Sequence, residues 1–87
     1  MWQKKMSKVH YYKIELNTLS DVKKFIEKAT MTNEKLKLSD GEGYTVSASS
    51  MMGAIYALEW ETLYLVSEND VYDKFQEFIR HSTIRYI

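Results

Sequence analysis

The stretch Ser49-Ser50-Met51-Met52-Gly53-Ala54-Ile55-Tyr56-Ala57-Leu58 decides how this chain is interpreted. Two hydroxyl side chains precede an apolar segment, and serine is a strong N-cap, so the pattern predicts a short helix from Ser50 to Leu58. Glycine inside a helix costs about 1 kcal/mol relative to alanine. Gly53 therefore indicates a helix whose backbone has to stay unobstructed at that position.

The residues before this helix predict a strand, a helix and a hairpin. Residues 9–16 alternate as a strand does, with Tyr12, Ile14 and Leu16 on one face and Tyr11, Lys13 and Glu15 on the other. Thr18-Leu19-Ser20-Asp21 has the pattern of a capping box and opens a helix over residues 19–30. Two short strands at residues 36–38 and 44–48 flank a turn that contains Gly41 and Gly43.

The residues after the helix predict one more strand and one more helix. Residues 62–66 form the fourth strand, and residues 67–70 cap a last helix whose apolar stripe is Val71, Phe75, Phe78 and Ile79. The sequence pattern does not predict a helix or a strand for the tail from Ser82 to Ile87. The order β-α-β-β-α-β-α predicts an α+β fold of two layers, a four-stranded antiparallel sheet with three helices on one face, in a single domain over residues 1–87.

Composition narrows the class of protein. The chain has 87 residues, 45% of them hydrophobic, and no cysteine, which excludes a disulfide framework and a thiol nucleophile. No apolar run suits a signal peptide or a membrane span, so we expect a cytoplasmic protein that binds no membrane. The formal net charge is zero, and we expect no nucleic-acid partner on that ground. The charge is uneven, however, with +3 over residues 1–44 and −3 over residues 45–87.

Three stretches carry a resemblance to HPr, the histidine-containing phosphocarrier of the bacterial sugar phosphotransferase system. Ser50-Met51-Met52-Gly53 followed by Ile55 is similar to the Ser-Ile/Leu-Met-Gly start of that family's second helix. Residues 36–46 look like the family's central hairpin, and residues 21–29 have the periodicity of its first helix. The resemblance implies an HPr-like sheet in which strand one lies at an edge beside strand four.

The resemblance breaks at the family's catalytic loop. Family members read Gly-Ile/Leu-His-Ala-Arg-Pro-Ala, whereas residues 16–22 here read Leu-Asn-Thr-Leu-Ser-Asp-Val, with Thr18 at the position of the histidine and Ser20 at that of the arginine. Asp21 places negative charge where a phosphate would bind at the helix N-terminus. His10, in a strand, and His81, at the end of the last helix, do not substitute for the missing histidine. We therefore expect no catalytic residue, no enzyme activity, no cofactor and no metal site.

Two features of the short helix admit two interpretations each. Ser50 is either an N-cap alone or, as the resemblance implies, also a regulatory phosphorylation site for HPr kinase/phosphorylase. Met51, Met52 and Ile55 either pack in the core or form the exposed partner-binding surface that the family uses. Ala54 and Leu58 are expected to pack on the sheet in the second case.

These features predict an HPr-like, non-catalytic regulatory or adaptor protein that binds a protein partner through residues 50–55. HPr kinase/phosphorylase and a transcriptional regulator are the candidate partners. The alternatives are a residual phosphotransferase-system component that competes with or replaces the phosphocarrier, and an unrelated structural module on a similar fold. Strand one has an unpaired edge in this topology, which predicts a monomer or a weak homodimer through that strand.

Overall fold

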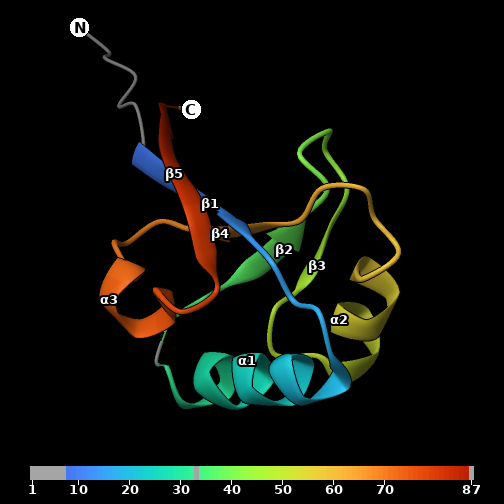
Figure 1. The fold of residues 1–87 in the computed structure, drawn as a ribbon. Coiled ribbons are helices and arrows are strands. Elements are labelled where there is room, and N and C mark those ends of the chain that lie inside the picture. The colour runs from blue at the N-terminus through green and yellow to red at the C-terminus, as the bar shows by residue number, and fades with distance from the viewer. Residues whose placement is uncertain (1–7, 33, 87) are drawn as a thin grey trace, which may run out of the picture.

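The computed structural model describes residues 8–32 and 34–86, and Figure 1 shows how they fold. The elements are, in chain order, β1 (Lys8–Ile14), α1 (Leu19–Met31), β2 (Lys37–Ser39), β3 (Thr45–Ser47), α2 (Met51–Ala57), β4 (Tyr64–Ser67), α3 (Tyr72–Phe75) and β5 (Ile79–Tyr86). The expectation of an N-terminus without a signal peptide rests on residues that lie outside this description. Among the described residues, no helix has the length and apolar character needed to cross a bilayer.

The strands form one antiparallel sheet in the order β3-β2-β4-β1-β5, so the predicted α+β class is confirmed. The expected number of four strands is wrong, because residues 79–86 form a fifth. Strand β1 lies beside β4 as expected, but β5 pairs with its other side from Lys8 to Ile14. Strand one is therefore not an edge, and the homodimer expected through it loses the free backbone on which it depended.

The last helix is shorter than the apolar stripe predicts. It ends at Phe75, and the chain turns at residues 76–78 before Ile79 begins β5. Phe75, Phe78 and Ile79 are all buried, so their burial was predicted correctly and their secondary structure was not. His81 lies in β5, not at a helix C-terminus. The backbone of residues 79–86 pairs with β1 in the sheet, in place of the intrahelical hydrogen bonds that a longer helix would make.

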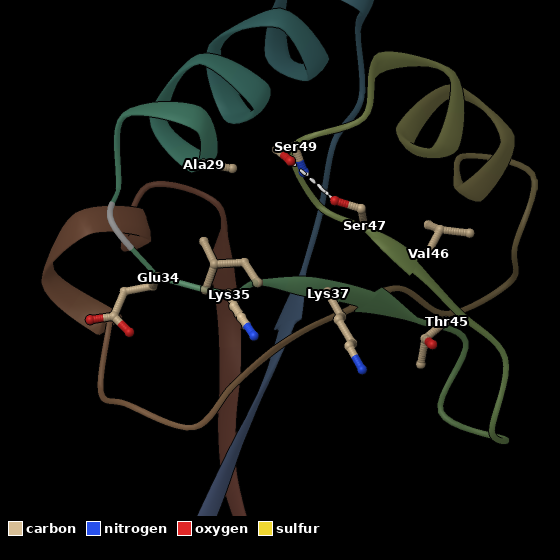
Figure 2. A pocket seen from close by; sticks show the side chains of 9 residues that line it. Ala29, Glu34, Lys35, Lys37, Thr45, Val46, Ser47 and Ser49 are labelled. Atoms are coloured by element: carbon tan, nitrogen blue, oxygen red, sulfur yellow. Dashed lines mark hydrogen bonds between the residues drawn. The ribbon is translucent and has the colours of Figure 1, made fainter.

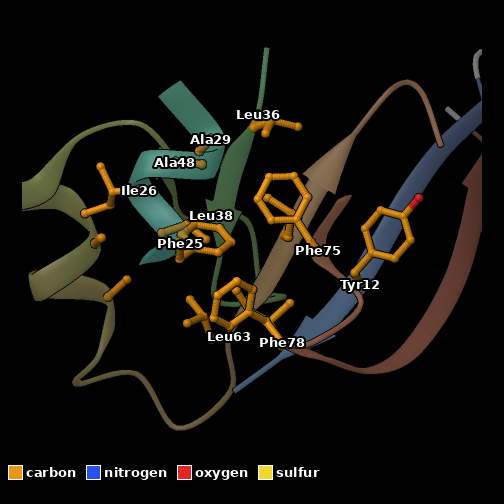
Figure 3. Close-up of a cluster of buried hydrophobic side chains, with 14 of the residues drawn as sticks. Tyr12, Phe25, Ile26, Ala29, Leu36, Leu38, Ala48, Leu63, Phe75 and Phe78 are labelled. Carbon is orange, nitrogen blue, oxygen red and sulfur yellow. The ribbon is translucent and has the colours of Figure 1, made fainter. Parts of the chain in front are cut away.

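A hydrophobic core joins all three helices to one face of the sheet (Figures 1 and 3). The apolar residues at helical spacing in α1 are Leu19, Val22, Phe25, Ile26 and Ala29; the last four are buried, whereas Leu19 in the first turn is 57% exposed. The ring centroid of Phe25 lies 5.3 Å from that of Phe75 and 5.6 Å from that of Phe78, which ties α1 to the segment around α3. The sheet contributes Tyr12, Leu38 and Leu65 from its three central strands. Its opposite face is free of helices in the described chain.

Candidate functional site

Helix α2 begins where the sequence predicts, at a serine cap. The Oγ of Ser50 accepts a hydrogen bond of 3.2 Å from the backbone N–H of Gly53, and its carbonyl accepts one of 2.9 Å from Ala54. The first bond satisfies one of the four backbone donors that the first turn of a helix leaves free, and the second is the first bond within the helix. Ser50 thus has the capping role of the first interpretation, and its role as a phosphorylation site stays a prediction.

Small residues let α2 lie close against the sheet. Ala54 and Ala57 are fully buried. A Cβ added to Gly53 would lie 3.3 Å from the Cβ of Val46, a tight contact with the strand β3 beneath the helix. The glycine predicted to keep the backbone unobstructed therefore lies where α2 meets β3.

The opposite side of α2 is apolar and faces solvent. Met52 is 82% exposed, Tyr56 55% and Ile55 46%. We call these three residues the α2 surface. Leu58, which was expected to pack on the sheet, is instead exposed, because Ala57 takes the core position three residues after Ala54. The side chain of Met51 lies outside the described part of the structure.

An aromatic cluster that the sequence analysis missed borders the α2 surface. The rings of Tyr44, Tyr56 and Trp60 contact one another in all three pairs, at centroid distances of 5.6 to 6.4 Å. Tyr44 comes from the end of the hairpin, and Tyr56 and Trp60 come from α2 and the turn after it. The spacing of four residues between Tyr56 and Trp60 was the one signal available, since such residues are neighbours on a helix.

Carboxylates gather beside this cluster. Asp40, Glu42 and Glu61 line a hollow of about 190 Å³ together with Trp60 and Thr62. Asp40 stabilises the hairpin turn, because its Oδ1 accepts a hydrogen bond of 2.7 Å from the backbone N–H of Glu42. Among the described residues, none of these three carboxylates forms an ion pair. The α2 surface thus ends at an acidic rim.

The helix start that would carry a phosphocarrier histidine is closed by a capping box. The Oγ1 of Thr18 accepts a hydrogen bond of 3.1 Å from the N–H of Asp21, and Asp21 Oδ2 accepts one of 3.3 Å from the N–H of Thr18. The capping box is therefore confirmed. Ser20 is exposed on the first turn. The capping role of Thr18 and Asp21 is sufficient to explain why these two residues occupy their positions.

The two histidines lie in neighbouring strands. His10 is buried in β1 with its ring stacked on that of Tyr12 at 5.8 Å, whereas His81 is exposed in β5. Within residues 8–32 and 34–86, no group of three or more histidine and acidic side chains could hold a metal ion.

A larger hollow of about 410 Å³ lies between the end of α1 and strands β2 and β3 (Figure 2). The hydroxyls of Ser47 and Ser49 lie 3.1 Å apart on its upper side. Lys35 and Lys37 also line it, but Figure 2 shows their side chains extending below the β2 ribbon, away from the two serines. The hollow therefore does not bring cations and hydroxyls together around one point.

Comparison with protein-family models, with curated proteins and with solved structures finds no match for this chain.

Proposed function

We propose that this domain is an HPr-like, non-catalytic regulatory or adaptor protein that binds a protein partner through the α2 surface. The observation that carries the proposal is the exposure of Met52, Ile55 and Tyr56 on one side of a helix whose other side is fully buried. Contiguous exposed apolar side chains of this kind mark interaction sites on soluble proteins. The serine-capped helix after the hairpin supports the HPr-like part of the proposal.

The surroundings of the α2 surface define the chemistry of the partner. Methionine and isoleucine offer an adaptable apolar contact, and Tyr56 extends it into the aromatic cluster. The acidic rim formed by Glu42 and Glu61 beside Trp60 would attract a cation. The partner segment that fits both parts carries an apolar side chain for the α2 surface and a lysine or arginine for the rim.

Selection of peptides tests the proposal without knowledge of the natural partner. A random peptide library is selected on the wild-type protein after depletion on a Met52→Lys variant. We expect the recovered peptides to combine apolar residues with lysine or arginine and to shift the amide resonances of α2. Met31→Lys is the matched control, because Met31 is 81% exposed at the end of α1 that lies away from α2 in Figure 1.

Two results would contradict the proposal. Peptides that bind Met52→Lys as tightly as the wild type do not use the α2 surface. Peptides whose binding is weakened equally by Met31→Lys and Met52→Lys respond to the charge of the protein and not to this site.

We also propose Ser50 as a regulatory position on this surface. A phosphate there would add close to two negative charges one residue before Met51 and two before Met52. Incubation with HPr kinase/phosphorylase and ATP is expected to add one phosphate to the wild type and to Ser49→Ala, and none to Ser50→Ala. Mass spectrometry reads the result, and a phosphate on Ser50→Ala or no phosphate on any of the three proteins refutes this role.

A further inference from the structure

The face of the sheet turned away from the helices brings together residues from four strands. Tyr11 lies opposite Val66 on β4 and Thr83 on β5. Lys13, two residues further along β1, lies opposite Tyr64 and His81. Residues that lie directly opposite in an antiparallel ladder share a face. The same rule adds the pairs Val9 with Arg85, Lys37 with Val66 and Ser39 with Tyr64. We call the surface formed by these residues the open face.

Positive charge is concentrated on the open face. Lys13, Lys37 and Arg85 belong to it by register, and Lys35 lines the same groove as Lys37. The one carboxylate in the lining of that groove is Glu68. Because neighbouring strands are about 4.8 Å apart, Lys37 on β2 and Arg85 on β5 lie on strands about 14 Å apart at the two margins of the face, and Lys13 on β1 lies between them.

Two further charged groups at the end of β1 offset each other. Arg80 Nε donates a hydrogen bond of 3.1 Å to Glu15 Oε2. This pair leaves the positive charge of the open face unchanged. The open face therefore has a local excess of positive charge, although the net charge of the chain is zero.

Aromatic rings lie between the two margins. The ring of Tyr64 meets that of Tyr11 edge-on at a centroid distance of 6.0 Å, and the guanidinium of Arg85 lies over the Tyr11 ring at 4.3 Å. Both tyrosines are half-buried, so the sheet fixes the rings while part of each faces solvent. Beside Tyr11 a shallow groove of about 390 Å³ runs over Val66 toward Lys37.

We propose that the open face binds single-stranded nucleic acid. Lys13, Lys35 and Lys37 contact phosphates, and Tyr11, Tyr64 and the guanidinium plane of Arg85, which lies over the Tyr11 ring, stack against unpaired bases. This combination of fixed aromatic rings with neighbouring cations is the general chemistry of single-strand binding surfaces.

The same residues disfavour the other anionic partners. A duplex keeps its bases stacked on each other and offers none to Tyr11 or Tyr64. A membrane surface needs exposed apolar side chains for insertion, and the aliphatic residues on this face, Val9 and Val66, are buried or half-buried. An acidic peptide would use the lysines but would leave the aromatic rings without a stacking partner. The expectation of no nucleic-acid partner was based on the charge of the whole chain, whereas this proposal rests on one face.

Fluorescence anisotropy with labelled oligo(dT) and oligo(U) of about ten nucleotides tests the proposal. We expect binding at low salt that weakens as salt is raised. For single strands each lysine in contact with a phosphate contributes about 0.7 to the slope of log affinity against log salt, so Lys13→Gln and Lys37→Gln should each lower the slope by about that amount. Tighter binding of either oligonucleotide assigns the natural ligand to RNA or to DNA and supports the proposal.

Matched variants separate the site from general effects. Lys23→Gln and Lys24→Gln remove the same charge from exposed positions of α1, behind the sheet, and should leave affinity and slope unchanged. Tyr11→Leu is expected to weaken oligonucleotide binding about tenfold without changing the salt slope. Tyr11→Phe keeps the ring and is expected to bind with the affinity of the wild type. Amide shifts of Val66 and Thr83 in the unmodified protein report contact without any substitution.

Four outcomes would overturn the proposal. The first two are no binding of the oligonucleotide at low salt and equal affinity for a duplex of the same sequence. The third is displacement of the oligonucleotide by poly-glutamate at equal charge concentration. The fourth is a loss of affinity in Lys24→Gln as large as that in Lys37→Gln. Binding confined to vesicles of anionic phospholipid would likewise exclude a nucleic-acid ligand.

Discussion

The hydroxyl of Tyr12 donates a hydrogen bond of 2.9 Å to Asp70 Oδ1, which links β1 to the segment that leads into α3. The same hydroxyl accepts a bond of 3.0 Å from the backbone N–H of Val71. Asp70 Oδ1 in turn accepts one of 3.0 Å from the N–H of Tyr72. One phenol therefore organises the start of α3 from a strand 58 residues earlier in the chain.

Tyr12→Phe should destabilise the fold by about 1–3 kcal/mol. The ring still fills its place in the core, but the N–H of Val71 loses its partner in a buried position, and the cost of such a donor is of that order. Urea unfolding followed by circular dichroism measures the change. Tyr86→Phe, at an exposed position of β5, is the control and should unfold as the wild type does. Equal stability of all three proteins would show that the Tyr12 hydroxyl contributes nothing net.

The free energy of unfolding should depend on pH through ionisation of the Tyr12 phenol. Burial raises the pKa of Tyr12 from its ordinary value of 10.0 to about 12. A raised pKa means that the folded protein holds the phenol proton more tightly than the unfolded chain does. The contribution of the Tyr12 phenol to the free energy of unfolding is therefore complete below pH 10 and is lost between pH 10 and about 12. The stability difference between wild type and Tyr12→Phe should narrow over that window. A difference that stays constant with pH would contradict the raised pKa.

Local patterns in the sequence were enough to predict the elements whose stability is local. The capping box at Thr18 and the apolar stripe of α1 involve residues three or four apart, and both are present in the structure. The Ser50 cap of α2 is of the same kind. These contacts form within one element, so periodicity and capping residues reveal them without knowledge of the rest of the fold.

Strand β5 could not be predicted in this way. Val71, Phe75, Phe78 and Ile79 are spaced for a helix, and all four are buried, but the contact that decides the structure of residues 79–86 is the ladder with β1. That partner lies more than sixty residues away along the chain. The open face also depends on distant partners, because the register of three strands brings Tyr11, Tyr64 and Arg85 together.

Met52→Lys should leave the thermal midpoint of unfolding nearly unchanged. Met52 is 82% exposed, so a charge at this position stays in water. Ala54→Lys on the opposite side of the same helix should destabilise the protein by several kcal/mol, because Ala54 is fully buried and a lysine there would force its charge into the core. Differential scanning calorimetry compares the two. Similar losses in both variants would mean that Met52 contributes to packing and would weaken the case for the α2 surface.

The contact between Gly53 and Val46 should appear as coupling between two substitutions. Gly53→Ala gains about 1 kcal/mol of helix propensity, but the added methyl would lie 3.3 Å from the Val46 Cβ, so the net change in the wild type should be small. Val46→Ala keeps that Cβ and removes the Cγ2 that lies 3.4 Å from the same methyl, which gives β3 more room to adjust. In this background Gly53→Ala should therefore recover most of the 1 kcal/mol. Four urea unfolding curves complete the double-mutant cycle. Equal effects of Gly53→Ala in both backgrounds would show that the close approach of α2 to β3 does not explain the glycine.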